Sequence, residues 1–150
     1  MMRKRDREVT DFEEIKALVD GCDTIRVGFS DDGTPYIVPL SFGFEAENGE
    51  FVFYVHGAKE GRRHKLAAKN SMVCVEADIC SGFVDLTADY KSFIGWGEIS
   101  PVTGEEAIKG LTLLCRHCGF DELGCSDKVI AMTCVEKIVV REFTAKQRFK

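Results

Sequence analysis

Two tight turns constrain this chain most, because they join three apolar segments with too few residues for a crossover helix. Residues 25–29, 36–44 and 51–56 are rich in β-branched and aromatic side chains, which is typical of strands. Asp31-Asp32-Gly33 separates the first pair and Asn48-Gly49 the second, and both are hairpin signals. Parallel strands need a connection of a dozen or more residues. The pattern therefore predicts consecutive antiparallel strands.

The rest of the chain adds strands and helices in the same style. Further strands are predicted over residues 72–79, 90–102 and 134–143, with a break at Ser81-Gly82 between the first two. Capping boxes at Thr10 and Thr103 begin two amphipathic helices, a basic helix covers about residues 60–69, and a short helix covers residues 127–133. This order predicts a mainly β (α+β) fold, a small antiparallel barrel of six to seven strands with flanking helices.

Length and charge limit the classes of function. The 150 residues fit one domain, 1–150, and the net charge of -5 argues against a nucleic-acid-binding protein, which would carry a broad basic face. No segment is apolar enough to cross a membrane, and the charged N-terminus lacks the apolar core of a secretory signal. We therefore expect a cytoplasmic protein with no membrane or nucleic-acid partner.

The seven cysteines do not form a recognisable framework. Their number is odd, which disfavours a set of disulfides, and in a reducing compartment most of them are expected to be small buried apolar residues. Cys115 and Cys118 have CxxC spacing, with Cys125 close behind. A structural zinc site normally has four ligands, and no second pair accompanies this one, so no metal site is predicted.

The segment after residue 56 has the composition of an anion site. Gly57, Ala58 and Gly61 leave the backbone accessible, and Arg62 and Arg63 follow where a helix begins with unpaired N–H groups. A phosphate group suits such a helix start, and arginine adds bidentate hydrogen bonds. The alternative is a solvated basic helix face.

Pro39 marks a second special position. It lies inside a predicted strand but has no N–H group to donate, so that strand is at an edge, bulged, or open to a ligand.

Three stretches together resemble a known family. GTPYIVPLSFGFE, FYVHGAKEGRRHKLAAKNS and YKSFIGWGEI are similar to the pyridoxamine 5′-phosphate oxidase-like FMN-binding split barrels, and most closely to their nitroimidazole-resistance (Nim-type) branch. The resemblance covers about residues 23–102. It implies a split barrel that forms a homodimer, with FMN held at the subunit interface.

The resemblance also implies roles for particular residues. Arg62 and Arg63 would bind the FMN phosphate, with Ser92 and Tyr90 completing the site from a neighbouring strand. His56 would lie near the flavin, although a hydrogen-bonded rim residue is the alternative, and Trp96 would pack on the ring, across the dimer, or in the core. The segment beside the isoalloxazine ring would be Val38, Pro39, Leu40 and Ser41.

The function implied is flavin redox chemistry. We expect a reductase of small electron-poor compounds such as nitroaromatics, with His56 as the candidate catalytic residue and a transient NAD(P)H or protein electron donor, since no G-x-G-x-x-G fingerprint is present. The substrate-phosphate arginines and extended C-terminal segment of true pyridoxamine-phosphate oxidases have no counterpart here. The alternative is a non-catalytic flavin- or haem-binding module for storage or sensing.

Lys146 lies where relatives often have a basic residue, but a solvated lysine explains it equally well.

Overall fold

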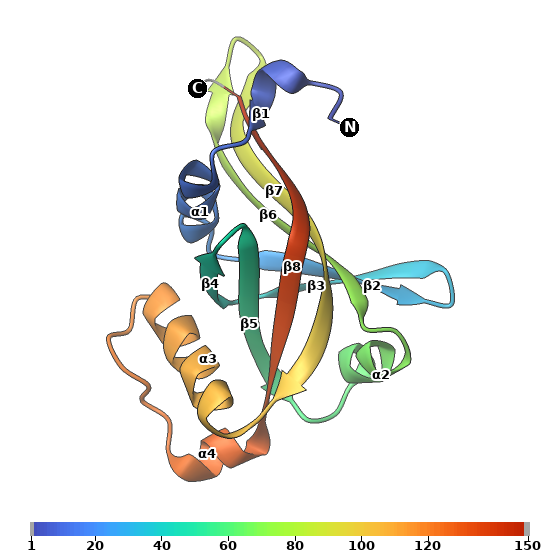
Figure 1. The fold of residues 1–150 in the computed structure, drawn as a ribbon, viewed down its shortest axis with the longest axis vertical. Helices are drawn as coiled ribbons and strands as arrows, with labels where there is room; N and C mark the ends of the chain where they lie inside the picture. The colour runs from blue at the N-terminus through green and yellow to red at the C-terminus, as the bar shows by residue number, and fades with distance from the viewer. Residues whose placement is uncertain (1, 149–150) are drawn as a thin grey trace.

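The computed structural model describes residues 2–148, which form one continuous antiparallel sheet with helices around it (Figure 1). The elements follow in the order η1 (Arg5–Arg7), β1 (Glu8–Val9), α1 (Phe12–Asp20), β2 (Ile25–Asp31), β3 (Thr34–Leu40), β4 (Gly43–Glu47), β5 (Glu50–Ala58), α2 (Arg62–Lys69), β6 (Met72–Val84), β7 (Thr87–Val102), α3 (Gly104–His117), α4 (Asp127–Met132) and β8 (Thr133–Gln147). The strands pair in the order β3-β2-β6-β7-β8-β5-β4, and β1 adds to β8. The predicted fold class, a mainly β split barrel with flanking helices, is confirmed.

The predicted strand over residues 36–44 is in fact two strands. It breaks at Ser41 and Phe42, so that β3 pairs with β2 while β4 pairs with β5, at opposite ends of the strand order. Phe42 is fully buried, with its ring centroid 5.7 Å from that of Phe53. A Cβ at Gly43 would lie 2.3 Å from the backbone nitrogen of Leu114 in α3. The chain therefore passes from one half of the split barrel to the other at Ser41 and Phe42. The packing of Phe42 and Gly43 fixes this position, and no turn residue is needed for it.

Strand β3 is an edge strand, which is one of the three alternatives that Pro39 left open. Pro39 lies opposite Arg26 of β2, and β3 ends the strand order on that side. Because proline lacks an N–H group, it is tolerated where one side of the strand is unpaired. The backbone on the open side of β3 is therefore available to a ligand or to another chain.

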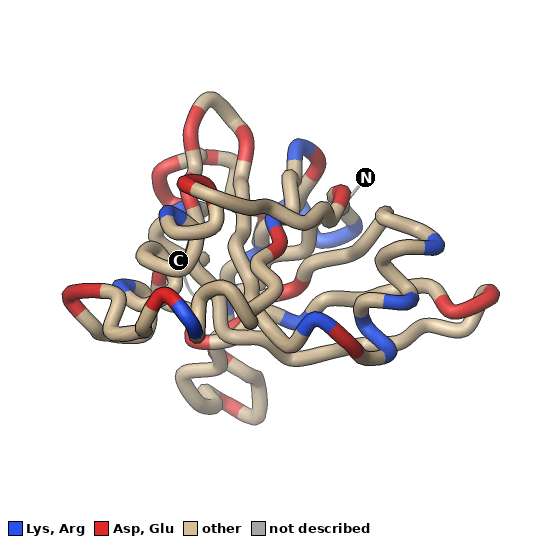
Figure 2. Tube along the Cα trace, turned by 90° about the horizontal axis from the view of Figure 1, so that it is seen from below, with Lys and Arg blue, Asp and Glu red and all other residues tan. Residues whose placement is uncertain are grey.

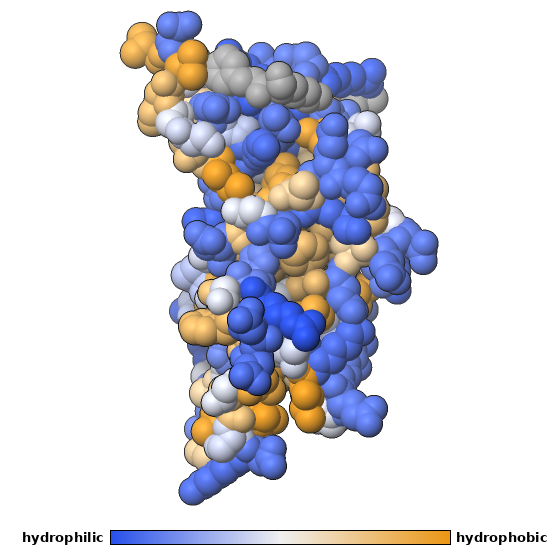
Figure 3. Space-filling model, turned by 90° about the vertical axis from the view of Figure 1, so that its left-hand side faces the viewer, coloured by the Kyte–Doolittle hydropathy of each residue, from blue (hydrophilic) through white to orange (hydrophobic). Residues whose placement is uncertain are grey.

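The hairpin between β6 and β7 is longer than predicted. The expected break at Ser81-Gly82 is a β-bulge, and the strands continue to a turn at Asp85 and Leu86, whose φ angles are 48° and 62°. The side chains of Phe83 and Leu86 are exposed at this end. Figure 3 shows hydrophobic atoms gathered near the top and the bottom of a face that is otherwise largely hydrophilic.

The helix starts differ in part from the capping boxes. Asp11, not Thr10, caps α1, because its Oδ1 accepts a hydrogen bond of 2.9 Å from the Glu14 amide. Thr103 occupies the cap position of α3 but makes no side-chain cap hydrogen bond. Carboxylate caps are at least as favourable as hydroxyl caps, so the neighbouring aspartate takes the role at α1.

Phenylalanine side chains fill the barrel. Phe51 is fully buried, and its ring centroid lies 5.1 Å from those of Phe93 and Phe143. A second, smaller cluster lies where α3 and α4 cover the lower end of the sheet, and it contains Val102, Ala107, Leu111 and Val135. The barrel interior is thus a packed core, which leaves ligand binding to its ends and outer face.

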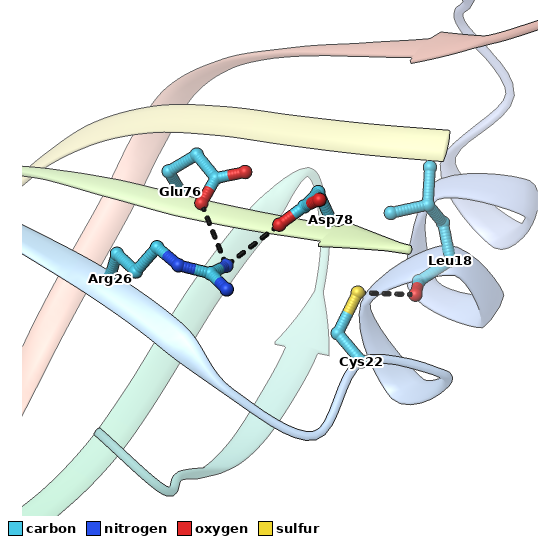
Figure 4. A network of polar contacts seen from close by, with 5 residues as sticks. All are labelled: Leu18, Cys22, Arg26, Glu76 and Asp78. Atoms are coloured by element: carbon cyan, nitrogen blue, oxygen red, sulfur yellow. Dashed lines mark hydrogen bonds and ion pairs between the residues drawn. The ribbon is translucent and has the colours of Figure 1, made fainter. Parts of the chain in front are cut away.

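Charged residues are spread over the whole chain. Figure 2 shows basic and acidic residues interleaved along the trace. On the outer face, the Arg26 guanidinium bridges two carboxylates of β6, at 3.2 Å from Glu76 and 2.7 Å from Asp78 (Figure 4). In the same view the Cys22 thiol donates to the Leu18 carbonyl oxygen at 3.3 Å.

Among the described residues, no helix has the length and apolar character needed to span a membrane.

Candidate functional site

The start of α2 is open in the way an anion site requires. Gly61 caps the helix with a φ of 133°, and it provides no side chain to bond the first-turn N–H groups. A Cβ added at Gly61 would meet nothing within 4 Å among the described residues. The first intrahelical bond is donated by the Lys65 amide to the Gly61 carbonyl at 3.2 Å, so the preceding amides are free to bind a ligand. Helix dipole and amides together favour an anion here.

Arg62 lies beside this helix start and faces solvent. Its Nη2 atom is 2.7 Å from Oδ2 of Asp31, and its guanidinium carbon lies 4.2 Å from the centroid of the Tyr36 ring. The side chain is 57% exposed. An ion pair with that exposure contributes little free energy, so an incoming phosphate can compete for the guanidinium while the Tyr36 ring keeps it in place.

Arg63 is held in a different environment. It forms an ion pair with Glu136 of β8, and the two side chains are only 11% and 3% exposed. A Cβ at Gly57 would lie 2.5 Å from Nη2 of Arg63, so the absence of a side chain at Gly57 makes room for the arginine. Sequence reasoning expected both Gly57 and Arg63 to serve the ligand. In the structure Gly57 accommodates Arg63, and the guanidinium of Arg63 already has a buried carboxylate partner.

Glu136 was missed at the sequence level. Within residues 2–148 it is the one charged residue that is buried, at 3% exposed, and it lies in a segment of β8 that reads as an apolar strand. An acidic residue on the inward face of such a strand needs a partner, since isolated buried charges are costly. The inward-facing strand position of Glu136 could have indicated a buried ion pair, but it could not identify the partner, because Arg63 lies 73 positions away along the chain.

His56 is close to the same arginine. It lies on β5 opposite Val135 of β8. Although His56 remains exposed to solvent, partial burial lowers the pKa of its imidazole, and the positive charge of Arg63 lowers it further. The ring therefore favours its neutral form, which can accept or donate a hydrogen bond at its exposed position near the end of β5.

The four residues predicted beside the flavin ring do not share one face. Val38 and Leu40 pack against the barrel core, on the same side of β3 as Tyr36, whereas Pro39 and Ser41 are exposed. Successive side chains of a strand point to opposite faces. A flat ligand along β3 would therefore meet the backbone of this segment and only part of its side chains.

Tyr90 and Ser92 lie far from α2 within one chain, whereas Trp96 pairs with Cys74 of β6, five residues after α2 ends at Lys69. Ser92 pairs with Lys146 of β8, whereas Pro101 pairs with Glu136, the partner of Arg63. Nine residues of strand at about 3.3 Å each separate these two points of β7, or roughly 30 Å. The Tyr90–Ser92 end of β7 therefore lies away from the start of α2, and one chain alone does not bring these two residues together with Arg62.

The outer face around Trp96 carries an apolar groove. Trp96 is 47% exposed, which rules out the core position considered for it. The groove has a volume of about 510 Å³ and runs over β3, β2, β6 and β7, with Ile37, Met72, Cys74 and Trp96 among its lining residues. A smaller cavity of about 320 Å³ continues past Trp96 to residues that sequence reasoning had treated separately, Ser92 and Lys146.

The CxxC pair forms no metal cluster. Within residues 2–148, the groups of three or more potential ligands do not include Cys115, Cys118 or Cys125. Burial raises the pKa of the Cys115 thiol, and the neighbouring Cys125 and Cys118 raise it further. The one such group found joins His64, Cys134 and Glu136, which sequence reasoning did not connect.

The architecture described above is that of an antiparallel split barrel. Sequence comparison is more specific: residues 11–147 match the family model described as pyridoxamine 5′-phosphate oxidase, and the chain belongs to this family. No curated protein matches the chain.

Solved structures agree with this assignment. A candidate 5-nitroimidazole antibiotic resistance protein from Bacteroides thetaiotaomicron has a TM-score of 0.82 at 26% identity, covering 93% of this chain and 85% of that one. The flavocytochrome Anf3 from Azotobacter vinelandii has a TM-score of 0.74 at 21% identity, covering 100% and 73%. An FAD and heme binding protein from Mycobacterium smegmatis has a TM-score of 0.79 at 17% identity, covering 96% and 74%. The suspected family and the Nim-like relationship are thus confirmed.

Proposed function

We propose that this protein binds FMN between two copies of the chain and reduces small electron-poor compounds such as nitroaromatics. The observation that carries the proposal is the start of α2, where Gly61 provides no side-chain cap, with Arg62 exposed beside it. The family assignment and the neighbours described as binding flavin support the same class of cofactor.

The phosphate of FMN would bind at the start of α2. The first-turn amides and the Arg62 guanidinium supply hydrogen bonds, and the Tyr36 ring positions the guanidinium. Arg63 would act mainly by pairing with Glu136, which fixes α2 against β8. In this proposal Arg62 contacts the phosphate, whereas Arg63 is a positioning residue.

A second copy would complete the site from the other end of the sheet. The groove beside Trp96 is apolar and open, and the exposed side chains of Ile37, Met72 and Trp96 give it the character of an interface. Ser92 lies roughly 30 Å along β7 from Pro101, the residue that pairs with Glu136, so we expect Ser92 to reach the same flavin from a partner subunit. The exposed Trp96 would approach the flavin from that subunit as well.

The flavin, when bound, supplies the electron transfer, and the chain supplies binding, orientation and exclusion of water. His56 favours its neutral form near the end of β5, so it can hold a proton on one ring nitrogen and accept one on the other. The donor, NAD(P)H or a reduced protein, would approach transiently. The alternative, a flavin- or haem-binding module without turnover, is favoured by neighbours described as a flavocytochrome and as an FAD and heme binding protein.

Flavin titration tests the phosphate site. Arg62→Ala should weaken FMN binding by roughly 10- to 150-fold, the equivalent of about 1.5–3 kcal/mol for a hydrogen bond to a charged group. Riboflavin, which lacks the phosphate, should bind both proteins alike. Lys69→Ala removes the same charge at the other end of α2 and should leave both ligands unaffected. Equal losses for FMN and riboflavin, or no loss for FMN, would contradict the proposal.

Two further measurements separate the reductase from the binding module and test the dimer. Anaerobic NAD(P)H oxidation coupled to loss of a nitroaromatic supports the reductase, whereas a flavin that stays oxidised under these conditions supports the module. Ile37→Lys places a charge in the apolar groove and should convert a dimer to a monomer in sedimentation while reducing FMN affinity. A wild-type monomer that binds FMN tightly would rule out the interfacial site.

A further inference from the structure

Three potential metal ligands converge behind the candidate phosphate site. An imidazole nitrogen of His64, the Cys134 sulfur and a Glu136 carboxylate oxygen all lie within 4.8 Å of one another. His64 comes from the first turn of α2, and Cys134 and Glu136 are two residues apart on β8, so their side chains share one face of the strand. Gly57 lies opposite Cys134 and adds no side chain to the space between them.

The polar atoms in this cluster are incompletely satisfied. Nε2 of His64 is buried and has no hydrogen-bond partner among the described residues. Nδ1 lies 3.8 Å from Oε2 of Glu136, which is longer than a hydrogen bond. Buried polar atoms in native structures are rarely left unpaired, and a bound ion is one of the partners that satisfy such an atom.

The carboxylate of Glu136 is oriented for a shared role. Its Oε1 atom accepts the hydrogen bond from Arg63, while Oε2 faces His64. One oxygen is therefore held by an outer hydrogen bond and the other is directed toward the two remaining donors. Metal-ligating carboxylates are commonly fixed in this way by a second residue.

We propose that His64, Cys134 and Glu136 bind a divalent cation of the zinc class. One nitrogen, one sulfur and one carboxylate oxygen suit Zn²⁺ or Co²⁺ in a tetrahedral site, with the fourth position open to water. Hard cations such as Mg²⁺ and Ca²⁺ prefer oxygen ligands only, so a thiolate argues against them. The site is separate from flavin binding through Arg62, and its presence does not depend on the proposed function.

The cation has a route to the site. Cys134 is half-buried and also lines a cleft of about 450 Å³ that residues of α3, α4 and Lys59 line as well. The three ligand atoms lie within 4.8 Å of one another, so the most distant of them must move closer by up to about 1 Å to bind Zn²⁺ at about 2.0–2.3 Å. Side-chain rotation of His64 and Cys134 can supply that movement.

Cobalt spectroscopy tests the proposal. Reduced, chelator-treated protein titrated with Co²⁺ should bind one ion per chain and show a thiolate-to-cobalt charge-transfer band together with the visible bands of tetrahedral Co²⁺. Cys134→Ser should abolish the charge-transfer band. His64→Ala should weaken Co²⁺ by more than about 100-fold, since even the loss of an outer-shell partner costs 10- to 100-fold.

The other cysteines provide the controls. The double variant Cys115→Ser/Cys118→Ser should keep the band and the affinity of the wild type. In the wild-type protein, Zn²⁺ should slow alkylation of Cys134 but not that of Cys74, a half-buried cysteine on the outer face, and this test does not require a variant to fold. Absence of the band from the wild type, its loss only in the Cys115/Cys118 variant, or equal alkylation of Cys134 with and without Zn²⁺ would overturn the proposal.

Discussion

Removing one partner of the Arg63–Glu136 ion pair should destabilise the fold strongly. Glu136 is 3% exposed and Arg63 11%, so the pair is desolvated and each charge depends on the other. Arg63→Met leaves a buried carboxylate without its cation, and breaking a pair of this kind costs about 3–5 kcal/mol. That loss is a large part of the roughly 5–15 kcal/mol that separates folded from unfolded states in most domains.

The size of the effect can be measured by denaturant unfolding and by thermal melts. At about 2–4 °C per kcal/mol for a domain of this length, the midpoint of Arg63→Met should fall by roughly 6–20 °C. The double variant Arg63→Met/Glu136→Leu replaces both charges with apolar groups, so it should recover most of the stability. Arg26→Met is the matched control, because Arg26 is 45% exposed and its ion pairs should contribute about 1 kcal/mol or less.

Two results would refute this reasoning. One is an Arg63→Met variant as stable as Arg26→Met, which would mean that water reaches the pair freely. The other is a double variant less stable than Arg63→Met alone, which would mean that Glu136 contributes through contacts other than the arginine.

Three further predictions follow from local geometry. Gly110→Ala should lower the free energy of unfolding by about 1–3 kcal/mol in urea unfolding, because the added Cβ would lie 2.5 Å from the buried Tyr54 ring. Gly124→Ala is the control: its Cβ would meet nothing within 4 Å, so the free energy of unfolding should change by less than about 0.5 kcal/mol. Burial, and after it the nearby carboxylates, raises the pKa of the Cys22 thiol to about 11. Iodoacetamide at neutral pH should therefore leave Cys22 unmodified in the native protein, as measured by mass spectrometry, and rapid modification would contradict its buried position. The pKa of the His56 imidazole, measured by NMR titration, should lie below its ordinary value of about 6.5. The stability of the fold should therefore fall as the pH drops through the unfolded-state pKa of about 6.5, and it should level off below the folded-state pKa. A titration midpoint at or above 6.5 would contradict the partial burial of His56.

Features that depend on neighbours in sequence were predictable. The turns at Asp32-Gly33 and Asn48-Gly49 adopt the positive φ angles that hairpins require, and β4 and β5 pair across the second turn. The start of α2 at Arg62 lies two residues after the predicted start at about residue 60, and it follows from the glycine before it and the basic run after it. In each case the residue types that form the element lie within a few positions of it.

Features set by distant contacts were not predictable from the pattern. The apolar run through Phe42 contains no turn signal, and only the buried position of its ring shows why the chain leaves one edge of the sheet for the other. Glu136 and Arg63 are joined across 73 positions, and Trp96 could have faced either side of β7 until the pairing was known. Long-range pairing is information that periodicity does not contain.

A crystal structure of the protein with FMN tests the central claim most directly. It should show two copies of the chain, with the phosphate bonded to the first-turn amides of α2 and to Arg62 while Arg63 stays paired with Glu136. The isoalloxazine ring should lie along β3, and Trp96 of the partner subunit should approach the same flavin. A phosphate bound away from α2, or a flavin contacted by one chain alone, would contradict the account.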